Sequence, residues 1–359
     1  YLYHVPNGYW GAGSLVSQDG YLVFSNQPPG HSASAAPKTA MAWCNPECHP
    51  SGNKRISSNQ DVLGFINDDT FPSYQLTDYV NTSILLDNDI VIQDGEECYI
   101  YNSILSFNLT DNGQYIIHVE SGGHLYINNS TIKSVDPTLK YAIIADKGSE
   151  IRIENSYLSD LGYRSSDFTK LTHGLVIQTD SALIRNTTFT NYFIAIRLYS
   201  SEVLSGITIT NNSFISDGND NEYYAAIRVD CSVDRLFITN NVFTAYSYSY
   251  SGVKLGSGTN CVISSNTFNN FGDAISLFGN LQDSQVSYNY IYDGRWSIEI
   301  WDGNNISIFG NKLYRNSCGF EIYGGSNLYL HENELFLSLI HISEPTRPLY
   351  ISYAVFCLK

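Results

Sequence analysis

Short runs in which apolar and polar residues alternate recur along most of the chain, and a polar turn follows each of them. Residues 306–309 (ISIF) and 319–324 (GFEIYG) are typical of these runs. Alternation with a period of two places the apolar side chains on one face of a strand, whereas an amphipathic helix needs a period near 3.6. The pattern therefore predicts an all-β chain built from many short strands.

Short blocks that combine a turn residue, usually Asn, with a following apolar residue repeat through the chain. The apolar residues that end the blocks are separated by 26, 31, 25, 29, 25, 23, 22 and 22 residues. This period, with a β-type composition, is typical of a solenoid in which each repeat is one coil that buries its apolar face against its neighbours. The blocks are NSTI (129–132), NSYL (155–158), NTTF (186–189), NNSF (211–214), NNVF (240–243), SNTF (265–268), YNYI (288–291), GNKL (310–313) and ENEL (332–335).

The Asn-rich repeat resembles that of right-handed parallel β-helix proteins of the pectate-lyase-like superfamily, especially the repeats of carbohydrate-binding and sugar-hydrolase domains. The resemblance implies a single-stranded right-handed β-helix with coils of 22–31 residues. Neighbouring coils lie about 4.8 Å apart, so residues 102–336 would form a rod roughly 50 Å long. The superfamily contains lyases, hydrolases, epimerases, adhesins and structural proteins, so the resemblance predicts the fold and not the function.

Two sets of residues in the repeat are expected to be structural. The turn asparagines are predicted to form a ladder of side-chain amides between coils, and Asn tolerates the left-handed turn conformation expected there. Apolar pairs on the second strand of each coil are predicted to face the core. The asparagines are Asn212, Asn241, Asn266, Asn289, Asn311 and Asn333, and the pairs are Ile196/Leu198, Ile227/Val229, Val253/Leu255, Ile275/Leu277, Ile298/Ile300 and Phe320/Ile322.

Residues 96–336 are therefore assigned to the β-helix, and the segments on either side differ from it. Residues 1–95 contain Pro/Gly/Ser-rich loops and show no repeat, so they are predicted to be an N-terminal cap or the remnant of a preceding domain. Residues 337–359 resemble the translation of a sequencing-library adapter, with both adapter halves in one frame. We interpret them as a non-native tail on a gene fragment, and we expect both natural termini to be missing.

Charge and composition narrow the possible partners. The chain has a formal net charge of −16, which becomes one unit more negative without the tail. Such an acidic surface repels phosphate backbones and anionic lipid headgroups, so neither nucleic acid nor membrane insertion of this fragment is expected. The β-rich composition and seven Asn-x-Ser/Thr sequons favour an extracellular or cell-surface protein, although such triplets also arise by chance in an Asn-rich chain.

Two columns of outward-facing residues form the main candidate site. One residue lies between the two members of each core pair, and stacking of the coils would align these residues in what we call the charged column. The residues two positions further along the same strands, here the aromatic column, include several aromatic rings. Rings can stack on sugars while charges bind hydroxyls or carboxylates, so this face is either a groove for a uronate-containing glycan or an ordinary solvated surface. The charged column is Arg197, Arg228, Lys254, Ser276, Glu299 and Glu321, and the aromatic column is Tyr199, Asp230, Gly256, Phe278, Trp301 and Tyr323.

Two mechanisms of chain cleavage are compatible with the charged column. Glu299 and Glu321 are one coil apart, so their carboxylates would lie either at the roughly 5 Å separation of retaining glycosidases or, if splayed apart, at the wider separation of inverting ones. Alternatively, Arg228 or Lys254 would abstract a proton beside a uronate carboxylate, as in a lyase. These four residues are the catalytic candidates. The residues predicted to bind the substrate are Arg197, Tyr199, Asp230, Phe278, Trp301 and Tyr323.

Other motifs are incomplete. Residues 271–279 (FGDAISLFG) resemble a polygalacturonase element, but Ala274 replaces its second Asp, so Asp273 is only an outside candidate. THG (172–174) resembles the His-Gly element of the same enzymes but precedes the first element instead of following it. No polygalacturonase site is therefore assigned.

Metal and cysteine motifs are also ambiguous. The loop DGNDNE (217–222) either binds Ca²⁺ or forms a polar turn, and Cys44, Cys48 and His49 fall short of four zinc ligands unless His31 joins them. No metal site is assigned. In an oxidising compartment disulfides are the expected use of the native cysteines, which are Cys44, Cys48, Cys98, Cys231, Cys261 and Cys318.

These features predict a secreted or surface β-helix protein that binds a polysaccharide or cell-surface glycan along the charged column. Whether it also depolymerises that glycan, as a lyase or a glycoside hydrolase, is left open by the sequence. The alternative is a non-catalytic surface adhesin or structural β-helix, whose solenoid supplies only length and display.

Overall fold

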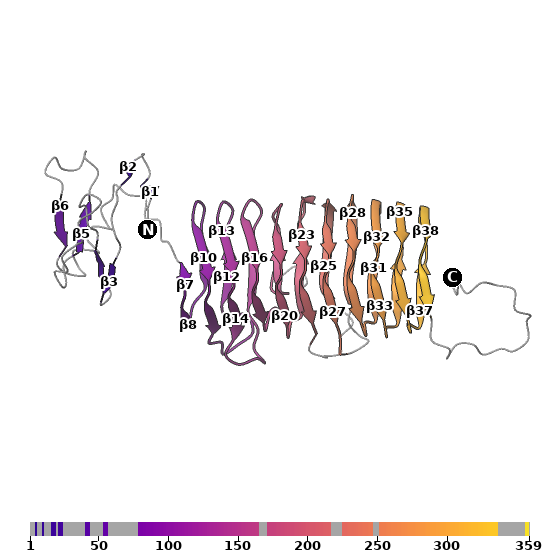
Figure 1. Cartoon of the computed structure of the whole chain (residues 1–359), viewed down its shortest axis with the longest axis horizontal. Helices are drawn as coiled ribbons and strands as arrows, with labels where there is room; N and C mark the ends of the chain where they lie inside the picture. Colours follow the sequence, from indigo (N-terminus) through magenta and orange to yellow (C-terminus); the bar gives the residue numbers. More distant parts are fainter. Residues whose placement is uncertain are drawn as a thin grey trace, which may run out of the picture. The chain divides into compact units, whose positions relative to one another are not determined.

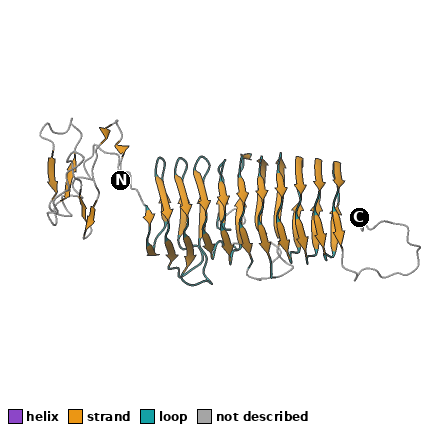
Figure 2. Ribbon diagram, viewed as in Figure 1, coloured by secondary structure: helices purple, strands orange, loops and turns teal. Residues whose placement is uncertain are grey.

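In the computed structural model every described secondary-structure element is a strand (Figures 1 and 2). The alternating sequence pattern explains this, because it gives each strand one apolar face. The described residues are 78–164, 171–216, 225–246 and 251–336, together with short strands within residues 4–56 and at 356–358.

The chain divides into two compact units, Tyr1–Gln75 and Leu76–Lys359. The described strands of the first unit form three antiparallel pairs. These pairs are β1 (His4–Val5) with β2 (Tyr9–Trp10), β3 (Val16–Gln18) with β4 (Tyr21–Val23), and β5 (Ala40–Trp43) with β6 (Asn53–Ile56).

The second unit is a solenoid whose strand pairings are parallel throughout its described residues. Each coil gives one strand to each of three ladders, which we call A, B and C in the order in which the chain visits them. Ladder A consists of β9 (Ile90–Ile92), β12 (Ile116–Val119), β15 (Ala142–Ala145), β18 (Leu175–Ile177), β21 (Ile194–Leu198), β25 (Ala225–Asp234), β28 (Ser251–Thr259), β31 (Asp273–Leu277), β34 (Trp296–Ile300), β37 (Cys318–Ile322) and β40 (Phe356–Leu358).

Ladders B and C complete the coils. Ladder B consists of β7 (Tyr79–Val80), β10 (Glu97–Tyr101), β13 (His124–Asn128), β16 (Glu150–Glu154), β19 (Leu183–Arg185), β23 (Thr208–Thr210), β26 (Phe237–Thr239), β29 (Val262–Ser264), β32 (Leu281–Ser287), β35 (Gly303–Phe309) and β38 (Ser326–His331), with the short β22 (Leu204–Ser205) pairing with the end of β25. Ladder C consists of β8 (Ser83–Leu86), β11 (Ile104–Phe107), β14 (Thr131–Ser134), β17 (Tyr157–Ser159), β20 (Thr188–Thr190), β24 (Ser213–Ile215), β27 (Val242–Thr244), β30 (Thr267–Asn269), β33 (Tyr290–Tyr292), β36 (Lys312–Tyr314) and β39 (Glu334–Phe336).

This architecture confirms the predicted all-β parallel β-helix. Ten complete coils run from β9 to β39, and Figure 1 shows their strands side by side. Parallel pairing already begins with β7 and β8, ahead of residue 96, where the repeat was expected to begin. The cap role of the preceding residues and the non-native origin of the tail remain predictions.

The interior is filled by apolar side chains that stack from coil to coil. Phe189, Phe214, Phe243 and Phe268 of ladder C form a continuous ring stack, with successive centroids 5.0, 4.8 and 4.5 Å apart. The core pairs expected from the sequence are buried, apart from Ile322 near the end of the described solenoid, which is partly exposed. Burying a phenylalanine ring contributes about 2–3 kcal/mol, so the stack is a major source of stability.

The predicted asparagine ladder lies at the turn between ladders B and C. The side-chain oxygen of Asn241, for example, accepts hydrogen bonds from the backbone N–H and the side-chain amide of Asn212, at 2.9 and 3.0 Å. The Asn241 amide in turn donates to Asn266 Oδ1 and to the carbonyl of Ile209. All six predicted asparagines take part in this ladder.

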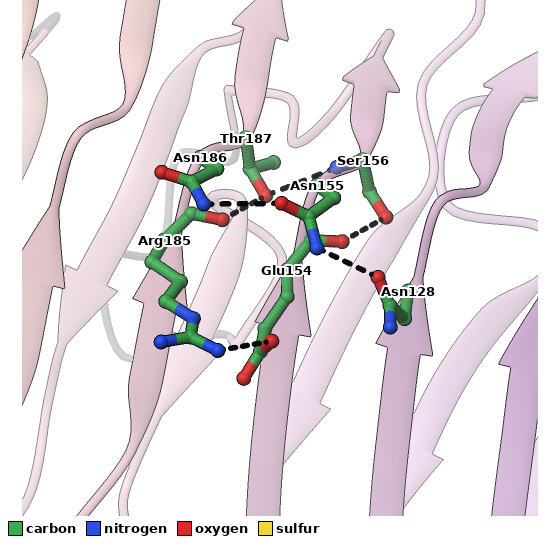
Figure 3. Close-up of polar contacts among 7 residues, drawn as sticks. All are labelled: Asn128, Glu154, Asn155, Ser156, Arg185, Asn186 and Thr187. Atoms are coloured by element: carbon green, nitrogen blue, oxygen red, sulfur yellow. Dashed lines mark hydrogen bonds and ion pairs between the residues drawn. The ribbon is translucent and has the colours of Figure 1, made fainter.

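One detail of the asparagine prediction was wrong. The left-handed conformation falls on the residue before each ladder asparagine, such as Asn211 and Asn240, both with φ of 56°. The ladder asparagine itself is buried or half-buried and is not among the residues with a positive φ. In the earlier coils Ser130, Ser156 and Thr187 occupy the same position, and a second row of exposed amides runs beside them. Figure 3 shows this second row as the bonds from Asn186 to Asn155 and from Asn155 to Asn128, at 3.0 and 2.9 Å.

Candidate functional site

The strand register brings the charged column together on ladder A. Arg197, Arg228, Lys254, Ser276, Glu299 and Glu321 occupy equivalent positions on the consecutive strands β21, β25, β28, β31, β34 and β37. The same column continues toward the N-terminal coils as Val176, Ile144, His118 and Val91. The column is thus largely apolar in the early coils, cationic in the middle and acidic in the last coils.

On a flat, solvated face Arg197 would be exposed. In the structure only 2% of its surface is exposed. Its Nε donates to Asp230 Oδ2 at 2.8 Å, and its Nη1 lies 2.8 Å from His173 Nδ1. The guanidinium also lies over the Tyr199 ring, 4.3 Å from the centroid. Arg197 therefore positions the surrounding residues and has little surface for direct contact with a ligand.

Asp230 joins the two arginines of the column. Its other carboxylate oxygen accepts a hydrogen bond from Arg228 Nε at 2.7 Å, so one carboxylate serves Arg197 and Arg228 together. This agrees with the expectation that closely spaced cations need an anion between them. Arg228 is half-buried, so part of its guanidinium faces solvent.

Lys254 has a carboxylate partner that the sequence analysis treated only as an outside candidate. Its Nζ lies 3.9 Å from Asp273 Oδ2, and Asp273 also accepts a hydrogen bond from Ser251 at 3.1 Å. The Lys254 side chain is 21% exposed, so the ion pair with Asp273 does not enclose the ammonium completely.

The acidic end of the column contains two carboxylates on adjacent coils. Glu299 accepts a hydrogen bond from Ser276 Oγ at 2.7 Å, and Glu321 accepts one from Tyr323 Oη at 2.7 Å. The hydrogen bond to Glu321 raises the pKa of Tyr323 to about 12, so its hydroxyl stays protonated at neutral pH. Glu321 is recessed, with 7% of its surface exposed.

The aromatic column presents exposed rings beside these carboxylates. Trp301 and Tyr323 stack with centroids 4.5 Å apart and an interplanar angle of 25°. Trp301 is 49% exposed, and Phe278 on the preceding coil is also exposed. Their outer faces are therefore open to a planar or ring-shaped ligand.

The sequence did not predict the contact of His173 with Arg197, and it made Asp273 only an outside candidate although Asp273 pairs with Lys254. Both lie outside the core-pair pattern, since His173 precedes β18 and Asp273 begins β31. The only sequence signals were THG and FGDAISLFG, which were read as incomplete family motifs. Alternation along β31 would not have found Asp273, because it shares the parity of the core residues Ile275 and Leu277 and pairs with the buried Ser251.

The metal and disulfide expectations have different outcomes. No group of three or more potential metal-ligating side chains occurs among the described residues, and the loop 217–222 and the Cys44–His49 motif lie outside them. The disulfide expectation was wrong for the four cysteines that the structure describes. Cys98, Cys231, Cys261 and Cys318 are buried thiols, placed on separate coils by the register that packs the core.

Comparisons with known proteins agree with the fold. A family model described as "Right handed beta helix region" matches residues 162–335, and this match agrees with the parallel solenoid that the structure shows over the described residues of that range. No curated protein matches the sequence. Over the described part of the chain there is no helix of sufficient length and hydrophobicity to cross a membrane.

Three solved structures are similar at low identity. The surface protein and adhesin PfbA of Streptococcus pneumoniae aligns with a TM-score of 0.43 and 14% identity, over 73% of this chain and 91% of PfbA. A second structure of PfbA gives a TM-score of 0.43 and 15% identity, over 78% and 89% of the two chains. The Dettilon tailspike protein gives 0.41 and 11%, over 72% of this chain and 62% of the tailspike. At such identities these similarities carry no information about binding or catalysis.

Proposed function

We propose that this protein is an extracellular or cell-surface β-helix that binds a uronate-containing polysaccharide along ladder A, from β25 to β37. The observation that carries the proposal is the register, in which a cationic cluster on β21, β25 and β28 and an exposed pair of stacked rings after β34 and β37 lie along one ladder, with one coil between them. Four coil steps separate Arg228 from Glu321, or roughly 19 Å at about 4.8 Å per step. This length suits an oligosaccharide better than a single sugar.

The cationic cluster favours an anionic sugar. Three cations, Arg197, Arg228 and Lys254, face two carboxylates, Asp230 and Asp273, so one positive charge is left over. On a chain with a net charge of −16 this cluster is a local excess of positive charge, and the carboxylates of Glu299 and Glu321 follow it on the same ladder. A uronate carboxylate would complete the charge balance at Arg228 and Lys254.

The aromatic end favours a sugar ring. Stacked Trp301 and Tyr323 offer a rigid apolar surface, and Glu299 and Glu321 are acceptors for sugar hydroxyls beside it. The combination of rings and carboxylates supports binding of pyranose units next to the uronate position.

The test is binding of uronate oligosaccharides to a double variant, Arg228→Ala with Trp301→Ala. We expect a loss of at least about tenfold in affinity, which corresponds to about 1.4 kcal/mol. The matched control is Arg185→Ala with Tyr329→Ala, which removes an exposed arginine and an exposed ring from ladder B. Equal affinities of the first double variant and the wild type would refute the proposal.

A second candidate function is hydrolysis of the bound chain. Glu299 and Glu321 occupy adjacent positions of one column, a spacing of about 4.8 Å between strands that is close to the separation of retaining glycosidase carboxylates. We expect new reducing ends from the wild type and a loss of at least about 10³-fold in rate for Glu299→Gln and Glu321→Gln, with binding retained.

The products distinguish the remaining alternatives. Unsaturated products that depend on Arg228 or Lys254 would indicate a lyase and contradict hydrolysis. Binding without any product would support the non-catalytic adhesin reading, in which the same face only holds the glycan.

A further inference from the structure

A second pair of stacked rings lies on ladder B, at the opposite end of the solenoid. Tyr99 on β10 and Tyr126 on β13 are direct register partners. Their ring centroids are 4.9 Å apart with an interplanar angle of 19°, and Tyr99 is 39% exposed. They form an aromatic platform on an outward face that is separate from the charged column.

Polar groups surround this platform in a fixed arrangement. Tyr99 Oη donates to Glu97 Oε2 at 2.8 Å, and Tyr126 Oη lies 3.2 Å from His124 Nδ1. Glu150 on the next coil lies 3.3 Å from the same His124 nitrogen and accepts a hydrogen bond from Arg152 at 2.9 Å. The hydrogen bond to Glu97 raises the pKa of Tyr99 to about 12, so its hydroxyl remains a neutral donor.

The arrangement repeats the aromatic end of the charged column. Glu97 and Tyr99 are two positions apart in the chain, as are Glu321 and Tyr323, and in both cases the tyrosine hydroxyl donates to the glutamate, at 2.8 and 2.7 Å. In both cases a second ring from the adjacent coil stacks on the tyrosine. A cross-strand ring pair can stabilise a sheet by itself, but that role does not require a carboxylate to fix the hydroxyl.

We propose that Tyr99 and Tyr126 form a second sugar-binding site, which takes a neutral hexopyranose chain. The charges select against an acidic glycan, because the carboxylates of Asp78, Glu97 and Glu150 lie at the platform, and among the contacts of the described residues Arg152 is the cation that pairs with one of them. A neutral sugar ring can stack on the tyrosines while the carboxylates and His124 accept or donate hydrogen bonds to its hydroxyls. The site is independent of the function proposed for ladder A.

The test isolates this site in the full chain by removing the other platform with Trp301→Ala and Tyr323→Ala. Cellohexaose, mannohexaose and maltohexaose are then titrated separately by calorimetry. We expect at least one of them to bind, and the added changes Tyr99→Ala and Tyr126→Ala to weaken that binding by about tenfold or more. Tyr99→Phe, which keeps the ring, should retain most of the affinity.

The control is Tyr290→Ala on ladder C, another exposed ring, which should leave the titration unchanged. Circular dichroism checks folding, and the single Tyr99→Ala variant replaces the double variant if the latter does not fold. Wild-type affinity in the tyrosine variants would overturn the proposal, as would no binding of any neutral hexasaccharide up to about 10 mM. Neither result would affect uronate binding on ladder A, which is measured with a different ligand.

Discussion

Asn266 illustrates how one side chain links three coils. Its oxygen accepts hydrogen bonds from the backbone N–H and the amide of Asn241, while its own amide donates to Asn289 Oδ1 and to the carbonyl of Ile238. The side chain is buried, so its removal leaves these partners inside the solenoid without the amide that they bond. Each buried polar group left without a partner costs about 1–3 kcal/mol.

We therefore expect Asn266→Ala to lower the free energy of unfolding by about 3–5 kcal/mol, measured by urea denaturation. Asn266→Ser should cost less, because serine occupies this position in earlier coils and bonds the backbone of its neighbours there. Asn280→Ala is the control, since Asn280 is exposed, its side-chain oxygen accepts a long hydrogen bond of 3.5 Å from Gln282, and its backbone bond to Gly258 would remain. Equal losses at residues 266 and 280 would show that the ladder is not a major source of stability.

The buried cysteines give a pH prediction. Burial raises the pKa of Cys98 and Cys231 from 9.0 to about 12 and that of Cys261 to about 11. At pH 8 almost none of these residues is a thiolate, so we expect peptide mapping to find them unmodified by iodoacetamide in the native protein and modified after unfolding. Disulfides that include any of them would contradict the structure.

The raised pKa values of these cysteines make the folded state less stable at high pH. The thiol pKa is higher in the folded state than in the unfolded state, so the contribution to stability is complete below about pH 9. It is lost as the pH rises from 9 toward 12, and thermal melting should show a decline in that window. A rise in melting temperature over the same window would contradict the assigned shifts.

For single residues, the sequence predicted which residues align from coil to coil better than it predicted how buried each side chain is and what it contacts. The period of the blocks was enough to align the asparagines and the charged column, because the register follows from counting. The burial of Arg197 was not predictable in this way. It depends on His173, which lies in a turn outside the repeat, and on the direction in which Asp230 points.

At the scale of the elements, the phenylalanine stack shows how the ladders resist change. Phe243 lies between Phe214 and Phe268, at 4.8 and 4.5 Å, and is completely buried. Its removal would leave a cavity between two rings that the parallel ladder holds in place. Neighbouring coils cannot close the gap, because their backbone spacing is set by hydrogen bonds.

We expect Phe243→Ala to lower the free energy of unfolding by about 3–5 kcal/mol, again from urea titrations. Phe237→Ala on ladder B is the matched control, because Phe237 is 37% exposed and should cost less than about 1 kcal/mol. A small effect at Phe243 would mean that the coils adjust their spacing more readily than the ladder geometry implies.

Strand alternation predicted short strands, but the run 306–309 is only the end of β35, and the run 319–324 continues two residues beyond β37. β25 and β28 extend across the corner between ladders A and B, and β25 changes register with β28 between Val229 and Ser232. The alternating pattern contains no signal for such a continuation. The early strands β7 and β8 were missed although Asn81 and Thr82 form the same turn as Asn102 and Ser103, because β7 is only two residues long.

At the scale of the whole molecule, stacking converts a one-dimensional repeat into long columns of side chains. A residue at one position of the repeat lies next to the residues at the equivalent position of the two adjacent coils. A few substitutions at that position along the chain therefore create an extended face. This explains how the charged column and the Tyr99 platform arise on the same solenoid without any insertion of a separate domain. The sequence could predict the columns, but it could not predict which of them bind a ligand.

The most direct test of the central claim is a crystal structure of the protein with the uronate oligosaccharide that it binds best. We predict density along ladder A, with a sugar ring on Trp301 and Tyr323 and a uronate carboxylate within hydrogen-bonding distance of Arg228 or Lys254. At a saturating ligand concentration, density confined to another face, or a charged column that makes no contact with the sugar, would contradict the account.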